Sequence, residues 1–179
     1  DHRGHGKTAE KNGELGYFAE SNGFERVTED VREVLLKVRE ELAEVPLILI
    51  GHSMGSFITR RYMQKYSDSL SKVILCGTAF SPNIQRELGL VVGKIASLVE
   101  TPKTDSEILN KLVFGDFNKQ IKEPQTPFDW LNKNADEVKK YMDDPLCGFI
   151  SSNQFYIDLF SGLKAIHKKS EIDKIKKDK

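Results

Sequence analysis

The spacing of hydrophobic residues in the first half of the chain predicts two helices and two strands. Pro46 ends the first helix, whose apolar face carries Val27, Val31, Val34, Leu35, Val38 and Leu42. Residues 47–50 and 73–76 are short, apolar runs, which are typical of strands buried on both faces of a parallel sheet. The second helix lies between these two runs, and its apolar face carries Phe57, Ile58, Tyr62 and Tyr66. Residues 47–76 therefore predict one βαβ unit.

Polar residues and glycines refine the boundaries of these elements. The segment from Gly13 to Gly23 is rich in Gly, Asn and Glu and predicts a loop. Glu29 and Asp30 are expected in the first turn of the helix that follows, where the helix dipole favours carboxylates. Two strands do not make a stable parallel sheet, so we expect further strands outside this chain at both ends.

After residue 81 the strand signals disappear and helical periods follow one another. Apolar spacing predicts helices over 84–99 and 108–113. Asn134 with Glu137, and Ser151 with Gln154, are capping boxes that predict two more helix starts. The last long helix is expected to bury Phe155, Tyr156, Leu159, Leu163 and Ile166. The lysine-rich tail from 168 to 179 is interpreted as a solvated helix end or linker.

The candidate chemistry centres on Gly51-His52-Ser53-Met54-Gly55, a G-x-S-x-G sequence. It directly follows a predicted buried strand and directly opens a helix, which is the context of a nucleophile elbow. We expect the flanking glycines, Gly51 and Gly55, to let this turn close against its neighbours, and the first helical amides to face a developing oxyanion. The alternative is a tight strand–helix turn in another kind of α/β protein.

Three stretches resemble the α/β-hydrolase superfamily, in its monoacylglycerol lipase, lysophospholipase and serine aminopeptidase-like branch. They are the loop Asp1-His2-Arg3-Gly4-His5-Gly6-Lys7-Thr8, the elbow segment 49–56 and the strand segment 72–78. The resemblance implies a partial α/β-hydrolase fold. Residues 1–80 then form part of the core, 81–167 a helical cap over the carboxyl end of the sheet, and 168–179 a connector back toward the core.

The resemblance also implies roles for individual residues. Ser53 is the expected nucleophile, held at a positive φ, and the Met54 backbone N–H is the expected oxyanion donor. The family order is Ser, then Asp, then His, which places the triad acid and base beyond Lys179. A second oxyanion amide is expected before residue 1. We therefore expect no imidazole of this chain to hydrogen-bond Ser53, and the isolated chain to be inactive.

Other features are weaker candidates for chemistry. His2, His5, His52 and His167 are interpreted as structural, and His2 with His5 lacks further metal ligands, so no metal site is expected. Gly6-Lys7-Thr8 resembles the end of a phosphate-binding loop, but Asp1 stands where that motif needs glycine. Gly4-His5-Gly6-Lys7-Thr8-Ala9 fits only a loose dinucleotide fingerprint and precedes both predicted strands. No cofactor is expected.

Composition narrows the function classes. Twenty-seven basic and 27 acidic side chains give a net charge of zero, which disfavours a nucleic-acid binder. No apolar run approaches the roughly 18 residues of a membrane span, so no stable membrane anchor is expected. Cys76 lies in an apolar run and is expected to be a buried free thiol, and with only one other cysteine, Cys147, a reducing cytoplasm is the expected location.

Together these features predict a cofactor-free serine hydrolase whose partner is a small-molecule ester with an apolar acyl chain. Monoacylglycerol or lysophospholipid is the first substrate hypothesis, small carboxylic esters the second and peptides the third. Ser53 disfavours epoxide hydrolases and dehalogenases, which use an aspartate nucleophile. A perhydrolase or haloperoxidase-like enzyme, and a binding protein without catalysis, remain alternatives, and the oligomeric state is open.

Overall fold

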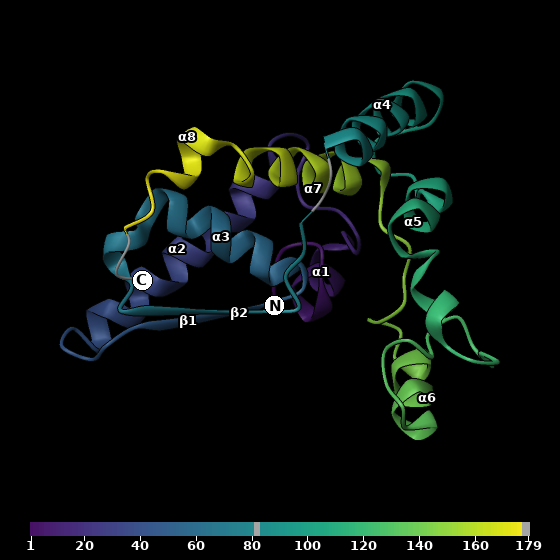
Figure 1. Ribbon diagram of the computed structural model, residues 1–179, viewed down its shortest axis with the longest axis horizontal. Coiled ribbons are helices and arrows are strands. Elements are labelled where there is room, and N and C mark those ends of the chain that lie inside the picture. The colour runs from purple at the N-terminus through teal and green to yellow at the C-terminus, as the bar shows by residue number, and fades with distance from the viewer. Residues whose placement is uncertain (81–82, 177–179) are drawn as a thin grey trace.

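The computed structural model describes residues 1–80 and 83–176 as helices around a short parallel sheet (Figure 1). The elements of the first half are α1 (Gly6–Asn12), α2 (Gly23–Glu41), β1 (Ile48–His52), α3 (Met54–Tyr66) and β2 (Lys72–Cys76), with a 3-10 turn at Ser67–Ser69. The second half holds α4 (Asn83–Val99), α5 (Glu107–Phe114), a 3-10 turn at Phe117–Gln120, α6 (Ala135–Asp143), α7 (Asn153–Ile166) and α8 (Lys169–Ile172).

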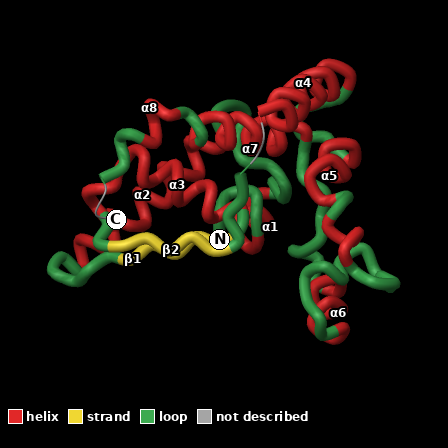
Figure 2. Tube along the Cα trace, viewed as in Figure 1, coloured by secondary structure: helices red, strands yellow, loops and turns green. Residues whose placement is uncertain are grey.

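The predicted βαβ unit is confirmed. β1 and β2 pair in parallel, with Ile48 opposite Lys72 and His52 opposite Cys76, and α3 connects them. In Figure 2 the helices α2 and α3 lie on the same side of the yellow strands. The carboxyl ends of both strands point toward the side of the molecule that carries α1, α5 and α6 (Figure 1).

The expected burial of both strand faces is wrong for this structure. Ile50 is 65% exposed and Ile74 51% exposed, whereas Leu49 and Val73, which alternate with them, are half-buried. Cys76 is a free thiol, as expected, but it is exposed rather than buried. The physical reason is that, within the described residues, each strand has one hydrogen-bonded neighbour and helices cover only one face of the pair.

The boundaries of the first helices differ from the prediction. α2 begins at Gly23, so Glu25 occupies its first turn, whereas Glu29 and Asp30 lie further along the helix. The predicted start of α2 was too late, because the apolar stripe used to place it begins at Val27, one turn after the first residue of the helix. The short helix α1 was not predicted, because Ala9 is its one buried residue and no apolar period marks it.

The second half is helical as predicted, and the part of it that the structure describes adds only an isolated bridge between Asp105 and Ser152. Residues 81 and 82 of the expected cap lie outside the described residues. Asn134 caps α6 as predicted. The cap of α7 is Ser152 rather than Ser151, and its side chain accepts from the Phe155 amide at 3.2 Å. Two adjacent serines precede this helix, and the capping pattern alone selected the wrong one.

Helix α7 is the centre of the hydrophobic core. It packs on α2, α3 and α4, and all five of the residues expected to be buried in it are buried. One cluster joins both halves of the chain: Phe18, Phe24, Val27, Ile58, Leu109, Phe155, Tyr156, Leu159, Phe160, Leu163 and Ile166. The core therefore runs across residue 80, where the core and cap segments were expected to divide.

The C-terminal segment is attached to the first half by ion pairs. Arg61 on α3 donates to Glu25 on α2 and to Glu171 on α8, both at 2.6 Å. Lys176 pairs with Asp68. The tail is thus more than a solvated linker as far as residue 176, and the rest of it, 177–179, lies outside the described residues. Among the described helices, none is long and apolar enough to cross a membrane.

Candidate active site

The G-x-S-x-G segment forms a sharp turn between β1 and α3. β1 ends at His52, α3 begins at Met54, and Ser53 between them has φ 50° and ψ −122°. The positive φ expected of Ser53 is observed. A non-glycine residue in this region is strained by about 1–3 kcal/mol and persists only where its surroundings hold it. Ser53 is exposed at the carboxyl end of the sheet, so its hydroxyl is accessible.

Backbone hydrogen bonds hold Ser53 from both sides. Its amide donates to the carbonyl of Cys76 at the end of β2, at 3.0 Å. Its carbonyl accepts from the Ser56 amide at 2.9 Å and from the Ser56 hydroxyl at 2.6 Å. The strained turn is therefore tied to both the neighbouring strand and the first turn of α3.

The two glycines of the motif differ in their surroundings. A Cβ at Gly51 would lie 2.6 Å from the Gly55 carbonyl oxygen and 2.9 Å from the Ser56 Cα, so only glycine fits there without a shift. A Cβ at Gly55 would meet no atom of the described residues within 4 Å. The close packing expected at both glycines is thus found only at Gly51, because Gly55 faces open space on the first turn of α3.

Ser53 opens into a hollow of about 360 Å³. The hollow is lined by His2, Val31, Leu49, Ile50, Gly51, His52, Ser53, Met54, Gly55, Ile58 and Thr59. Five of the eleven lining residues have apolar side chains, two are glycines and four are polar. Met54 is the first residue of α3, and the first amides of a helix have no partner within it. The Met54 N–H is therefore available, next to Ser53, to an oxygen that gains negative charge.

Two of the four histidines, His5 and His167, hydrogen-bond to backbone carbonyls. His5 donates from Nδ1 to the Arg3 carbonyl at 3.2 Å and lies among the rings of Phe18, Phe149 and Phe155. His167 donates from Nδ1 to the Leu163 carbonyl at 2.6 Å. Across the described residues, no side chain hydrogen-bonds to the hydroxyl oxygen of Ser53, although His2 and His52 line the same hollow.

Burial lowers the pKa of His2 and of His5 below the ordinary imidazole value. The charge of His5 lowers the pKa of His2 further, and the carboxylate of Asp30 raises it. Both rings are therefore held neutral at neutral pH. No group of three or more potential metal-ligating side chains occurs in the ranges that the structure describes.

The loop at the start of the chain is fixed by contacts that sequence patterns did not indicate. Arg3 makes two hydrogen bonds of 2.6 Å to the carboxylate of Asp30 on α2. Asp1 accepts from the Lys7 amide at 2.9 Å. These contacts position His2 beside the Ser53 hollow. Arg3 and Asp30 are 27 residues apart, and no local pattern could have paired them.

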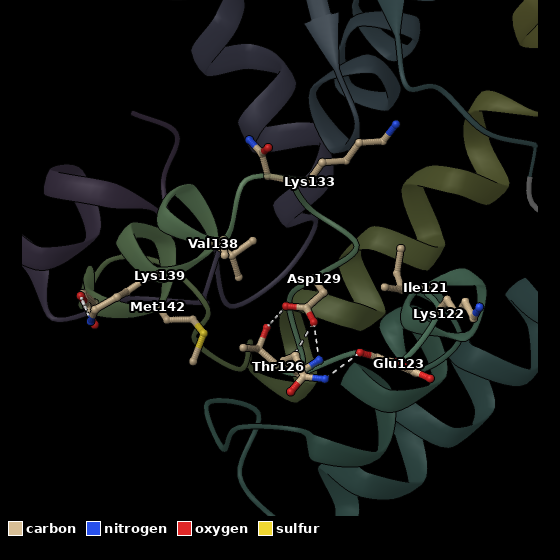
Figure 3. A pocket seen from close by; sticks show the side chains of 13 residues that line it. Ile121, Lys122, Glu123, Thr126, Asp129, Lys133, Val138, Lys139 and Met142 are labelled. Carbon is tan, nitrogen blue, oxygen red and sulfur yellow. Dashed lines mark hydrogen bonds and ion pairs between the residues drawn. The ribbon is translucent and has the colours of Figure 1, made fainter.

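A larger hollow, of about 600 Å³, lies between α6 and the preceding loop (Figure 3). Val138 and Met142 form part of its wall, and it shares no lining residue with the Ser53 hollow. Its Asp129 accepts from the Gln125 and Thr126 amides and so stabilises the loop. It holds no serine, cysteine or histidine, and the hydroxyl of its Thr126 donates to Asp129 as part of the loop's own structure, so the Ser53 hollow is the better candidate.

Comparison with known proteins gives the same family as the motifs. The family model described as serine aminopeptidase S33 matches residues 1–175. Over 121 residues the chain is 29% identical to the proline iminopeptidase PfmaB of Pestalotiopsis fici, and over 116 residues 27% identical to a monoacylglycerol lipase of Mycolicibacterium smegmatis. These alignments cover 68% and 62% of this chain but 39% of each relative, so the matched part is well under half of their length.

Solved structures agree with this result. A thermostable carboxyl esterase from Bacillus coagulans superposes with a TM-score of 0.86 at 28% identity, over 98% of this chain and 57% of the esterase. A lipase in an open form superposes with a TM-score of 0.83 at 24% identity, over the same shares, which supports the fold alone. The chain therefore carries part of an α/β-hydrolase fold and belongs to the serine aminopeptidase S33 family.

Proposed function

We propose that the protein is a serine hydrolase of carboxylic esters and that Ser53 is its nucleophile. The observation that carries the proposal is the Ser53 turn, with its positive φ, its exposure and its place beside the free amide of Met54. A strained serine between a strand and a helix is the geometry in which a hydroxyl is presented to a substrate carbonyl. Because the chain matches only part of its relatives, the activity of the whole protein is part of this proposal.

In the proposed reaction the Ser53 oxygen attacks the ester carbonyl carbon, and the serine proton passes to a histidine base. The Met54 N–H stabilises the negative charge that develops on the carbonyl oxygen. The alcohol leaves with that proton and the acyl group stays on Ser53. Water, deprotonated by the same base, then releases the acid and restores the serine. No cofactor takes part.

We propose that the triad acid and histidine, and the second oxyanion amide, lie outside these 179 residues. The contacts of His5 and His167 with backbone carbonyls support this assignment. A serine hydroxyl without a base is a weak nucleophile, so the 179-residue chain alone is expected to hydrolyse no ester above background. Measurable turnover by the isolated chain that Ser53→Ala abolishes would contradict this part of the proposal.

We propose a monoacylglycerol or a lysophospholipid-like ester as the substrate. The apolar residues that share the Ser53 hollow support an acyl chain, and the names of the lipase and esterase relatives support an ester bond. The iminopeptidase relative and the family's description make an aminopeptidase the second candidate. The free thiols of Cys76 and Cys147 support a cytoplasmic location.

A substrate panel on the full-length protein separates the two functions. Release of fatty acid from a monoacylglycerol and a lysophospholipid is measured beside release of nitroaniline from aminoacyl nitroanilides. The proposal predicts ester turnover that Ser53→Ala abolishes and little anilide turnover. Anilide cleavage that exceeds ester cleavage would assign the peptidase function instead, and no turnover of either class would favour a binding protein.

A further inference from the structure

The residue that follows the G-x-S-x-G motif contacts the strained turn directly. Ser56 is fully buried, and its hydroxyl donates to the Ser53 carbonyl oxygen at 2.6 Å. The Ser56 amide donates to the same oxygen at 2.9 Å. Serine hydroxyls in helices commonly bond to a carbonyl three or four residues earlier. Here that carbonyl belongs to the one residue of the turn that has a positive φ.

The accepting carbonyl is part of the same peptide unit as the proposed oxyanion donor. The Ser53 C=O and the Met54 N–H lie in one planar trans peptide, so they point in opposite directions and turn together. A group that fixes the direction of the carbonyl therefore fixes the direction of the amide. Hydrogen bonds to the carbonyl also polarise the peptide and strengthen its N–H as a donor.

We propose that the Ser56 hydroxyl is a positioning group for catalysis, which aims the Met54 amide at the oxyanion and holds the Ser53 turn in its reactive conformation. This inference rests on the proposed function of Ser53. Ser56 touches no substrate atom in this role, because it is buried behind the turn. It acts through the Ser53–Met54 peptide, while the hydrogen bond from the Ser53 amide to the Cys76 carbonyl fixes the preceding peptide.

The chain offers a matched control for a merely structural role. Thr28 on α2 is also fully buried, and its hydroxyl donates to the Phe24 carbonyl at 2.9 Å, four residues earlier. Removing either hydroxyl leaves a helix carbonyl short of one buried donor. Thr28 makes no contact with the Ser53 turn in the hydrogen bonds of the described residues, so only Ser56 is connected to the proposed chemistry.

The test uses the full-length protein, with Ser56→Ala, Ser56→Cys and Thr28→Val beside the wild type. A fluorophosphonate probe reports the acylation step: the Ser53 oxygen bonds to phosphorus, fluoride leaves, and the proton passes to the base. Rates of labelling, kcat and KM for an ester, and melting temperatures are compared at a temperature where each variant is folded. Ser56→Cys keeps the size of the side chain with a weaker donor, and so serves if Ser56→Ala does not fold.

The proposal predicts that Ser56→Ala lowers kcat and the labelling rate about fivefold, the factor of one net hydrogen bond lost from the transition state, with KM unchanged. Thr28→Val lowers the melting temperature about as much as Ser56→Ala does, but it is labelled at the wild-type rate. Equal labelling of wild type and Ser56→Ala, or slowing by Thr28→Val to the same degree, overturns the inference while leaving Ser53 as nucleophile. Absence of labelling at Ser53 in the wild type overturns the proposed function as well.

Discussion

Asp158 is a buried acid on α7 that the proposed reaction does not use, and its ionisation should govern the pH dependence of stability. It is 3% exposed. One carboxylate oxygen accepts from the Gly23 amide at the start of α2, at 3.0 Å, and from the Gln154 side chain at 3.2 Å. The other oxygen is buried and has no hydrogen-bond partner among the residues that the structure describes. Burial raises the pKa of Asp158 from 3.8 to about 6, although both hydrogen bonds lower it.

The sign of the effect follows from proton linkage. Because the pKa of Asp158 is higher in the folded state than in the unfolded state, the folded protein binds more protons between pH 4 and 6. The free energy of unfolding therefore falls as the pH rises through this window. The pKa difference corresponds to a loss of about 3 kcal/mol, complete above pH 6 to 7.

Replacement of Asp158 by Asn tests this reasoning. The Asn side-chain oxygen can still accept from the Gly23 amide, while its NH2 group stands where the partnerless oxygen was, at a cost of about 1–3 kcal/mol. Near pH 7 that cost offsets the gain from removing a buried charge, and stability should be close to wild type. At pH 4.5 the variant should be less stable than the wild type, because Asp158 of the folded wild type is then protonated and most of the charge penalty is gone.

The assay is urea denaturation of the full-length protein at intervals from pH 4.5 to 7.5. Wild type and Asp158→Asn share all other titrating groups, so the difference between their unfolding free energies isolates Asp158. A difference that changes by about 2–3 kcal/mol across this range agrees with the burial argument. A difference that is constant with pH would show that Asp158 keeps an ordinary pKa and would refute it.

Two further predictions concern packing and capping. Gly162→Ala places a methyl group against the ring of the buried Phe24 and should lower the free energy of unfolding by about 1–3 kcal/mol. Gly55→Ala, whose methyl group meets no atom of the described residues within 4 Å, should leave it unchanged. Equal effects of the two substitutions in urea denaturation would contradict the packing argument. Ser152→Ala removes the cap of α7 and a hydrogen bond to the Gly16 carbonyl, and should cost about 1–3 kcal/mol by the same assay. A free energy of unfolding equal to wild type would show that Ser152 does not hold this helix.

The features that sequence predicted correctly depend on local patterns. The two strands and the helix between them are marked by residues that are close in sequence, and the motif placed Ser53 at the strand–helix junction. The positive φ of Ser53 was expected from the family resemblance and is observed. These features need few distant contacts, so a short stretch of sequence specifies each of them.

The features that sequence missed depend on distant contacts. The exposure of Ile50 and Cys76 follows from which elements cover the sheet, and the strands themselves carry no sign of it. Asp158 and Gly23 are 135 residues apart, and no periodicity relates them. A signal did exist for Asp158, because it is an acid within the apolar stripe of α7, and such a residue calls for a buried partner.

The central claim is that Ser53 is the nucleophile, and covalent labelling tests it most directly. The full-length protein is treated with a fluorophosphonate probe, digested, and its peptides are identified by mass spectrometry. The claim predicts one adduct, on the peptide that contains Ser53, and no labelling of the Ser53→Ala variant under the same conditions. An adduct on another residue that persists in Ser53→Ala, or an intact Ser53 in a protein that still hydrolyses esters, would contradict it.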